Sequence, residues 1–144
     1  MTIEFLWAWG GFTAATIVCA LAAWRGGWAE RTVGATLWVA WVASLLIESH
    51  GPDRPGLQVI LIDWFVLFVF VAVSLKERRI WTLLLVASQV DDVASHATAH
   101  LLHYGLYSYI TATGIWGGQF LIGCLAAGLI GYRRRSRSVK MAPA

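Results

Sequence analysis

The sequence predicts an all-α membrane protein, a polytopic bundle of five transmembrane helices. Of its 144 residues, 58% are hydrophobic and only 13% are charged, whereas a typical soluble domain carries about 25% charge. The nine tryptophans also fit a membrane protein, because Trp gathers at the lipid–water interface. We expect one transmembrane domain over residues 1–132 and a basic, cytoplasmic, disordered tail over residues 133–144.

The first two spans lie on either side of a basic segment. Residues 3–24 are mostly apolar and long enough to cross a bilayer. A cleaved signal peptide is disfavoured there, because Glu4 is present and no Lys or Arg precedes the apolar run. Residues 32–47 form a shorter apolar run that ends at Glu48, and the Pro- and Gly-rich stretch 51–56 then predicts a loop.

The last three spans include one ambiguous segment. Residues 57–75 are apolar except for Asp63, and the basic turn 76–79 follows. Residues 80–90 are too short to span a membrane unless the helix continues through the Asp/His stretch to about residue 104. The alternative is four spans plus a polar loop. The final span, residues 106–132, carries small residues that allow close helix packing.

The distribution of basic residues favours five spans over four. With the N-terminus outside, the segments 25–31 and 76–79 and the basic tail all become cytoplasmic, and of the eleven Lys and Arg only Arg54 stays outside. Four spans would split these segments between the two sides of the membrane. Because Lys and Arg concentrate in cytoplasmic loops, we expect a multi-pass membrane protein with its C-terminus in the cytoplasm.

A group of acidic and histidine residues is the candidate site. Spacings of four, four and three residues place Asp92, His96, His100 and His103 within an arc of about 80° on one helix. The predicted topology brings Glu48, His50, Asp63 and Asp91 to the same outer level of the membrane. The candidate metal ligands are Asp92, His96, His100, His103, Asp63 and Glu48. His100 and His103 could instead be ordinary interfacial residues, and Glu48 could cap its helix.

Two chemistries fit this group. Imidazole and carboxylate ligands suit a divalent metal such as zinc, copper, iron or manganese. Alternating carboxylates and imidazoles could equally relay protons. Haem is disfavoured because only one helix carries the histidines. Cys19 and Cys124 lie in apolar runs and are expected to be buried. No hydrolase or nucleotide-binding motif occurs, so whether the protein is an enzyme stays open.

Other classes of function remain as alternatives. The chain could be a structural or accessory subunit of a larger membrane complex, or a holin-like protein with several spans and a basic tail. The expected partners are the lipid bilayer, anionic lipid at the basic tail, and a second copy of the chain or a larger complex. Nucleic acid is not expected, because no aromatic or glycine pattern accompanies the basic residues.

The second half of the chain resembles a loose group of small, uncharacterised bacterial inner-membrane proteins. The resemblance is carried by Asp63, the run from Lys76 to Trp81, Gln89, His96 and the segment 115–117. It implies a bacterial inner-membrane location and no particular activity. His100, His103 and the pair Asp91–Asp92 are not part of the shared pattern.

Overall fold

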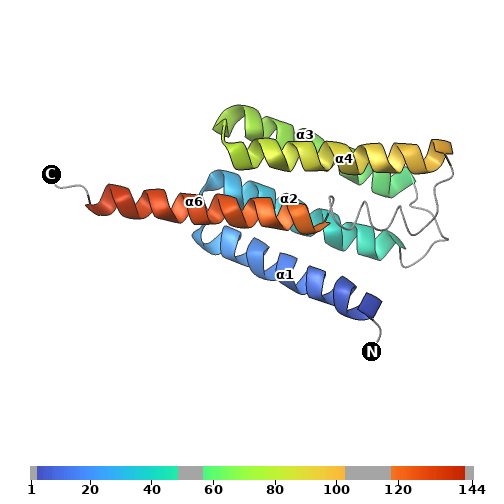
Figure 1. The fold of residues 1–144 in the computed structure, drawn as a ribbon, viewed down its shortest axis with the longest axis horizontal. Coiled ribbons are helices and arrows are strands. Elements are labelled where there is room, and N and C mark those ends of the chain that lie inside the picture. The colour runs from blue at the N-terminus through green and yellow to red at the C-terminus, as the bar shows by residue number, and fades with distance from the viewer. Residues whose placement is uncertain (1–2, 49–56, 103–117, 142–144) are drawn as a thin grey trace.

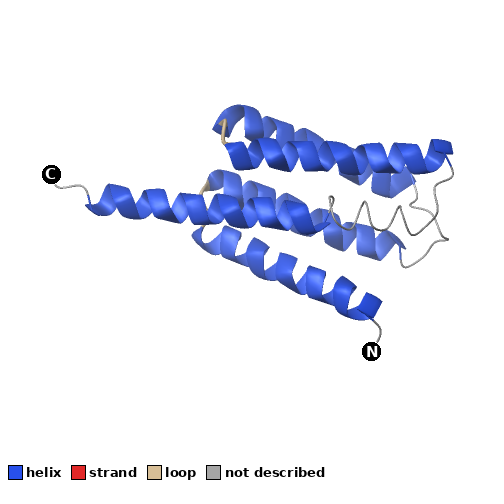
Figure 2. Ribbon diagram, in the orientation of Figure 1, coloured by secondary structure: helices blue, strands red, loops and turns tan. Residues whose placement is uncertain are grey.

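A computed structural model describes residues 3–48, 57–102 and 118–141, which form a bundle of long helices (Figures 1 and 2). Within these residues the chain has no strand, so the all-α prediction is confirmed for this part of the protein. The helices are α1 (Ile3–Arg25), α2 (Trp28–Glu48), α3 (Leu57–Glu77), α4 (Ile80–Leu102) and α6 (Leu121–Met141).

The helices pack mostly against their neighbours in the sequence. The pairs α1–α2, α2–α3 and α3–α4 are in contact, and α6 closes the bundle against α1 and α4 with a smaller contact to α2 (Figure 1). The α1–α2 turn, the α3–α4 turn and the C-terminal half of α6 lie at the same end of the bundle, on the left in Figure 1. We call this the basic end, because the basic segments 25–31, 76–79 and 133–135 all lie there.

The turn between α1 and α2 consists of Gly26 and Gly27. A β-carbon at Gly26 would lie 2.5 Å from the carbonyl oxygen of Ala22, so a larger residue would force the turn open. The Gly27 amide donates to Oε2 of Glu30 at 3.0 Å. A glutamate three residues into a helix that accepts from the residue before the helix is half of a capping box. The expected loop 25–31 is therefore much shorter, and Glu30 belongs to α2.

The turn between α3 and α4 is equally short. Arg78 has a φ of 50°, the left-handed conformation that ends many helices, and its amide donates to the carbonyl of Ser74 at 2.9 Å. Helix α4 starts at Ile80 and continues without a break to Leu102. The Asp/His stretch is thus helical through Leu102, as the five-helix interpretation predicted, and the alternative of a polar loop beginning at residue 91 is wrong.

Helix α6 differs from the expected last span. It continues to Met141, so the segment 133–141, expected to be a disordered tail, is helical. The beginning of the expected span, residues 106–117, lies outside the described residues.

Large apolar side chains from α3, α4 and α6 fill the core. Phe70, Leu85, Leu121 and Leu125 are completely or almost completely buried. Many equally large apolar side chains are exposed instead, and α3 alone exposes Leu61, Trp64, Phe65, Phe68 and Leu75.

One helix in the described part of the chain, Gln58–Glu77, is long and apolar enough to cross a membrane, with a mean hydropathy of 2.4. One such helix is weak evidence for a membrane protein, because the core helix of a soluble protein can pass the same test. In this helix, however, only 33% of the apolar window is buried.

Candidate metal centre

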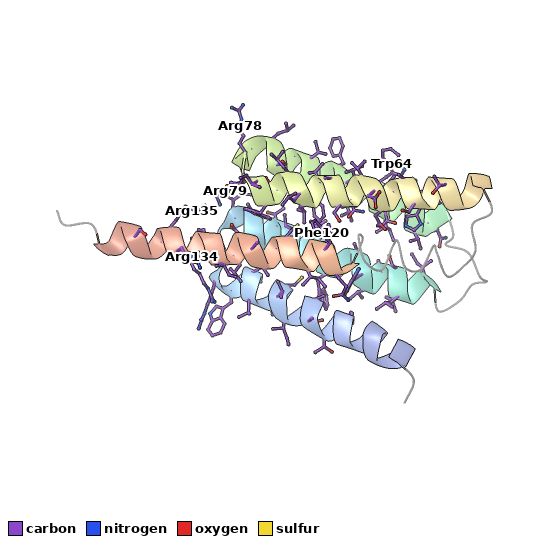
Figure 3. The ribbon with its side chains drawn as sticks, viewed as in Figure 1. Trp64, Arg78, Arg79, Phe120, Arg134 and Arg135 are labelled. Carbon is purple, nitrogen blue, oxygen red and sulfur yellow. The ribbon has the colours of Figure 1, made fainter. Side chains whose placement is uncertain are left out.

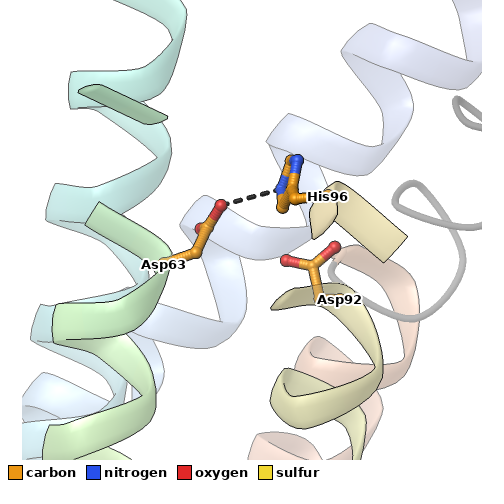
Figure 4. Close-up of side chains that lie close together, drawn as sticks. All are labelled: Asp63, Asp92 and His96. Carbon is orange, nitrogen blue, oxygen red and sulfur yellow. Dashed lines mark ion pairs between the residues drawn. The ribbon is translucent and has the colours of Figure 1, made fainter. Parts of the chain in front are cut away.

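The short α3–α4 turn sets the level at which the two helices meet. Asp63 lies fifteen residues before Arg78, while Asp92 and His96 lie thirteen and seventeen residues after Arg79. Because both helices rise by the same amount per residue, the antiparallel pair places Asp63 midway between Asp92 and His96. Asp92 and His96 are one turn apart on the same face of α4. Figure 4 shows the three side chains converging between the two helices.

The three side chains form one compact group. Nε2 of His96 lies 2.8 Å from Oδ2 of Asp63, and the nearest ligand atoms of all three residues lie within 4.8 Å of one another. Asp92 and His96 are buried, with 6% and 4% exposure, and the Asp63 side chain is 15% exposed. The group is therefore enclosed within the bundle, where charged groups need compensation.

The carboxylates of this group are incompletely satisfied. Oδ1 of Asp92 and Oδ2 of Asp63 are buried, and neither accepts a hydrogen bond in the described part of the protein. The close approach of His96 to Asp63 is thus an ion-pair distance without hydrogen-bond geometry. Among the described residues, Nε2 of Gln89 donates to Oδ2 of Asp92 at the long distance of 3.5 Å. Buried carboxylate oxygens without donors are uncommon, and a cation is the natural partner for them.

The three side chains lie close enough together to hold a metal ion. Two carboxylates and one imidazole give three ligands, the number that protein sites with open coordination positions commonly provide. Oxygen and nitrogen ligands suit manganese, iron or zinc, and none of the three is a soft thiolate. Gln89 lies about one turn before Asp92 on α4, and its exposed fraction is 2%. Its amide is placed to orient the carboxylate, as residues behind the ligands do in metal sites.

The structure unites three of the six predicted ligands: Asp63, Asp92 and His96. Glu48 is the last residue of α2 and His100 lies within α4, but their side chains lie outside the described part of the protein. His103, and His50 beside the predicted site, also lie outside the described residues.

Two further polar residues lie apart from the group. Asp91 is exposed on another side of α4. The amide of Gln119, which lies just before α6, is close to Gly11 of α1.

The sequence-based reasoning missed a second buried carboxylate, Glu30, at the basic end. Its exposure is 1%, and Oε1 lies 3.4 Å from Nη1 of Arg79 while Oε2 accepts from Gly27. Arg79 also contacts Glu77 at 2.8 Å. The sequence feature that indicates this position is the Gly-Gly pair followed three residues later by a glutamate. A glutamate at that spacing is typical of the first turn of a helix.

Comparisons with models of protein families, with curated proteins and with solved structures found no match to this chain. The resemblance to small bacterial inner-membrane proteins is neither supported nor opposed by these comparisons.

Proposed function

We propose that this protein is a small integral membrane protein of five spans that binds a divalent metal ion at Asp63, Asp92 and His96. The membrane part of the proposal depends on where polar and apolar side chains lie. Among the described residues, seven polar or charged ones are buried, including Glu30, Gln89 and Asp92, while each of the five helices exposes at least one large apolar side chain, such as Trp24, Phe68 or Ile130. Such a distribution is unfavourable in water and favourable in lipid.

The orientation follows from charge. The described Lys and Arg side chains come from the basic end of the bundle, and cytoplasmic ends of membrane helices are enriched in these residues. We therefore propose that the basic end faces the cytoplasm of a bacterial cell and that the N-terminus lies outside. A reporter enzyme that is active only in the cytoplasm, fused after Ala144, should be active. A fusion that is active only in the periplasm would contradict this orientation.

The observation that supports a metal site best is the pair of buried carboxylate oxygens without hydrogen bonds, one from Asp63 and one from Asp92, beside the His96 imidazole. A cation between them would compensate the negative charge of both carboxylates and would be coordinated by the imidazole nitrogen of His96. Manganese, iron and zinc suit this donor set, and copper is favoured by raw affinity.

Metal analysis of the purified full-length protein tests the site. We expect close to one equivalent of a divalent metal in the wild type and a large loss in Asp92→Asn and in His96→Ala. The neighbouring exposed residue offers a matched control, because Asp91→Asn removes the same charge one position away from the group. Equal metal content in all four proteins would refute the site. A metal-free wild type that co-purifies with larger membrane proteins would favour the accessory-subunit alternative.

A further inference from the structure

The basic end carries far more positive than negative charge. Its described side chains come from three segments that are distant in the sequence. Figure 3 labels four of these side chains, Arg78, Arg79, Arg134 and Arg135. The Lys and Arg residues with described side chains are Arg25, Arg31, Lys76, Arg78, Arg79, Arg133, Arg134 and Arg135. The acidic residues at this end are Glu30 and Glu77. The segments of this end therefore form a cationic surface around the helix ends.

Most of this positive charge is not compensated inside the protein. Glu30 and Glu77 both pair with one residue, Arg79. Among the described side chains, no other Lys or Arg forms an ion pair with a carboxylate. Arg134 and Arg135 are exposed, whereas Nη2 of Arg133 is buried and has no hydrogen-bond acceptor in the described part of the chain. The guanidinium groups of Arg134 and Arg135 are thus left for a partner that carries negative charge.

Two tryptophans mark the level of a lipid–water interface at this end. Trp24 is 72% exposed and Trp28 is 43% exposed. The guanidinium of Arg25 lies 4.6 Å from the centre of the Trp24 ring, and the ammonium of Lys76 lies 4.3 Å from the centre of the Trp28 ring. Exposed tryptophans with adjacent cations are the arrangement found at headgroup level, where the ring contacts lipid and the cation contacts phosphate.

Helix α6 places its arginines close to this level, because the ring of Tyr132 lies beside Gly27 in the turn between Trp24 and Trp28. The headgroup region on each side of a bilayer is about 5–8 Å thick, and a helix crosses that distance in about four or five residues. Arg133, Arg134 and Arg135 follow directly after the apolar part of α6 and remain helical. They would therefore lie within the headgroup layer. A guanidinium binds phosphate through two parallel hydrogen bonds.

We propose that the basic end binds the headgroups of anionic phospholipids, with Arg134 and Arg135 on α6 as the main contacts. The inference depends on the membrane location proposed above. Basic residues beside an anionic membrane surface each contribute about fivefold in affinity. The removal of Arg134 and Arg135 together should therefore weaken binding by about 25-fold.

The test uses the full-length protein in a nonionic detergent, titrated with phosphatidylglycerol or phosphatidylcholine, with bound lipid counted by native mass spectrometry. We expect the wild type to prefer phosphatidylglycerol. The double variant Arg134→Gln/Arg135→Gln should lose this preference, and Arg134→Lys/Arg135→Lys should keep most of it. Arg54→Gln, which removes a charge predicted for the opposite side, should change binding less than twofold.

Equal affinity for the two lipids, or an unchanged double glutamine variant, would overturn the inference. Insertion of the same protein into lipid nanodiscs distinguishes a failure of the headgroup site from a failure of the proposed membrane location. A protein that inserts without preferring anionic lipid contradicts the headgroup site alone. A protein that stays outside the nanodiscs contradicts the membrane location, and the headgroup site with it.

Discussion

Replacing Asp92 with asparagine should change the stability of the protein in opposite directions with and without metal. In the metal-free protein, the ligand oxygens of Asp63 and Asp92 lie within 4.8 Å. Two like charges at that distance repel by about 3.5 kcal/mol at an effective dielectric constant of about 20. Polar groups around the two carboxylates, among them the His96 imidazole 2.8 Å from Asp63, reduce this repulsion. Asp92→Asn should therefore stabilise the metal-free protein by about 1–3 kcal/mol.

The same substitution should be unfavourable when metal is present. A ligand at about a thousand times its dissociation constant stabilises the folded state by about 4.1 kcal/mol. The wild type would gain this amount. The asparagine variant, which lacks one of three ligands, would gain little of it. The order of stability should thus reverse between the two conditions.

Thermal unfolding in detergent measures both effects, once with a chelator and once with saturating manganese or zinc, at mildly alkaline pH where free carboxyl groups are ionised. For a chain of this length, 1 kcal/mol corresponds to about 2–4 °C in the midpoint. Asp91→Asn, at the exposed neighbouring position, should move neither midpoint appreciably. If Asp92→Asn lowers the midpoint by the same amount with and without metal, the carboxylate supports the fold and the argument for a cation site is refuted.

Three further substitutions test other parts of the argument. Gln89→Ala should weaken metal binding by about 10–100-fold in a competition assay, because the amide orients a ligand; unchanged affinity would show that it has no such role. Arg79→Ala should lower the free energy of unfolding by about 1–3 kcal/mol in a denaturant titration, since it leaves the buried glutamate of α2 with one partner. Gly128→Ala should cost about 1–3 kcal/mol, because its methyl group would lie 2.8 Å from the Trp81 ring. The control Gly123→Ala has open space and should cost nothing; equal costs for the two glycines would contradict the packing of α4 on α6.

The helices could be predicted more completely than their ends. Apolar runs of about twenty residues identified α1 and α3, and the distribution of Lys and Arg decided that the stretch from residue 91 is helical. The apolar run of α2 predicts a start at residue 32, which is too late, because the charges of Glu30 and Arg31 are typical of a loop. Their helical state comes from the capping contact between Gly27 and Glu30, which composition does not reveal.

The part of the site that lies on α4 could be predicted from the geometry of a helix. Asp92 and His96 share a helix face through their spacing alone. Predicting that Asp63 joins them requires its position along the bundle. The turn at residues 78–79 fixes that position, because the residues on either side of the turn can be counted. What the sequence cannot supply is the rotation of α3 about its own axis. That rotation is set by the burial of Phe70 and Val66 against the other helices, and it decides that Asp63 faces α4.

The chain itself offers a comparison that separates an ion site from a structural ion pair. Glu30 is more deeply buried than Asp63 and Asp92, yet each of its oxygens has a donor of its own, the amide of Gly27 and the guanidinium of Arg79. Its charge is compensated by the protein, which leaves no vacancy for a ligand. Asp63 and Asp92 each keep a buried oxygen that accepts no hydrogen bond from the described residues, and the His96 nitrogen lies 2.8 Å from the Asp63 carboxylate without forming one. The lack of hydrogen-bond donors, rather than burial, therefore supports the group between α3 and α4 as the proposed metal site.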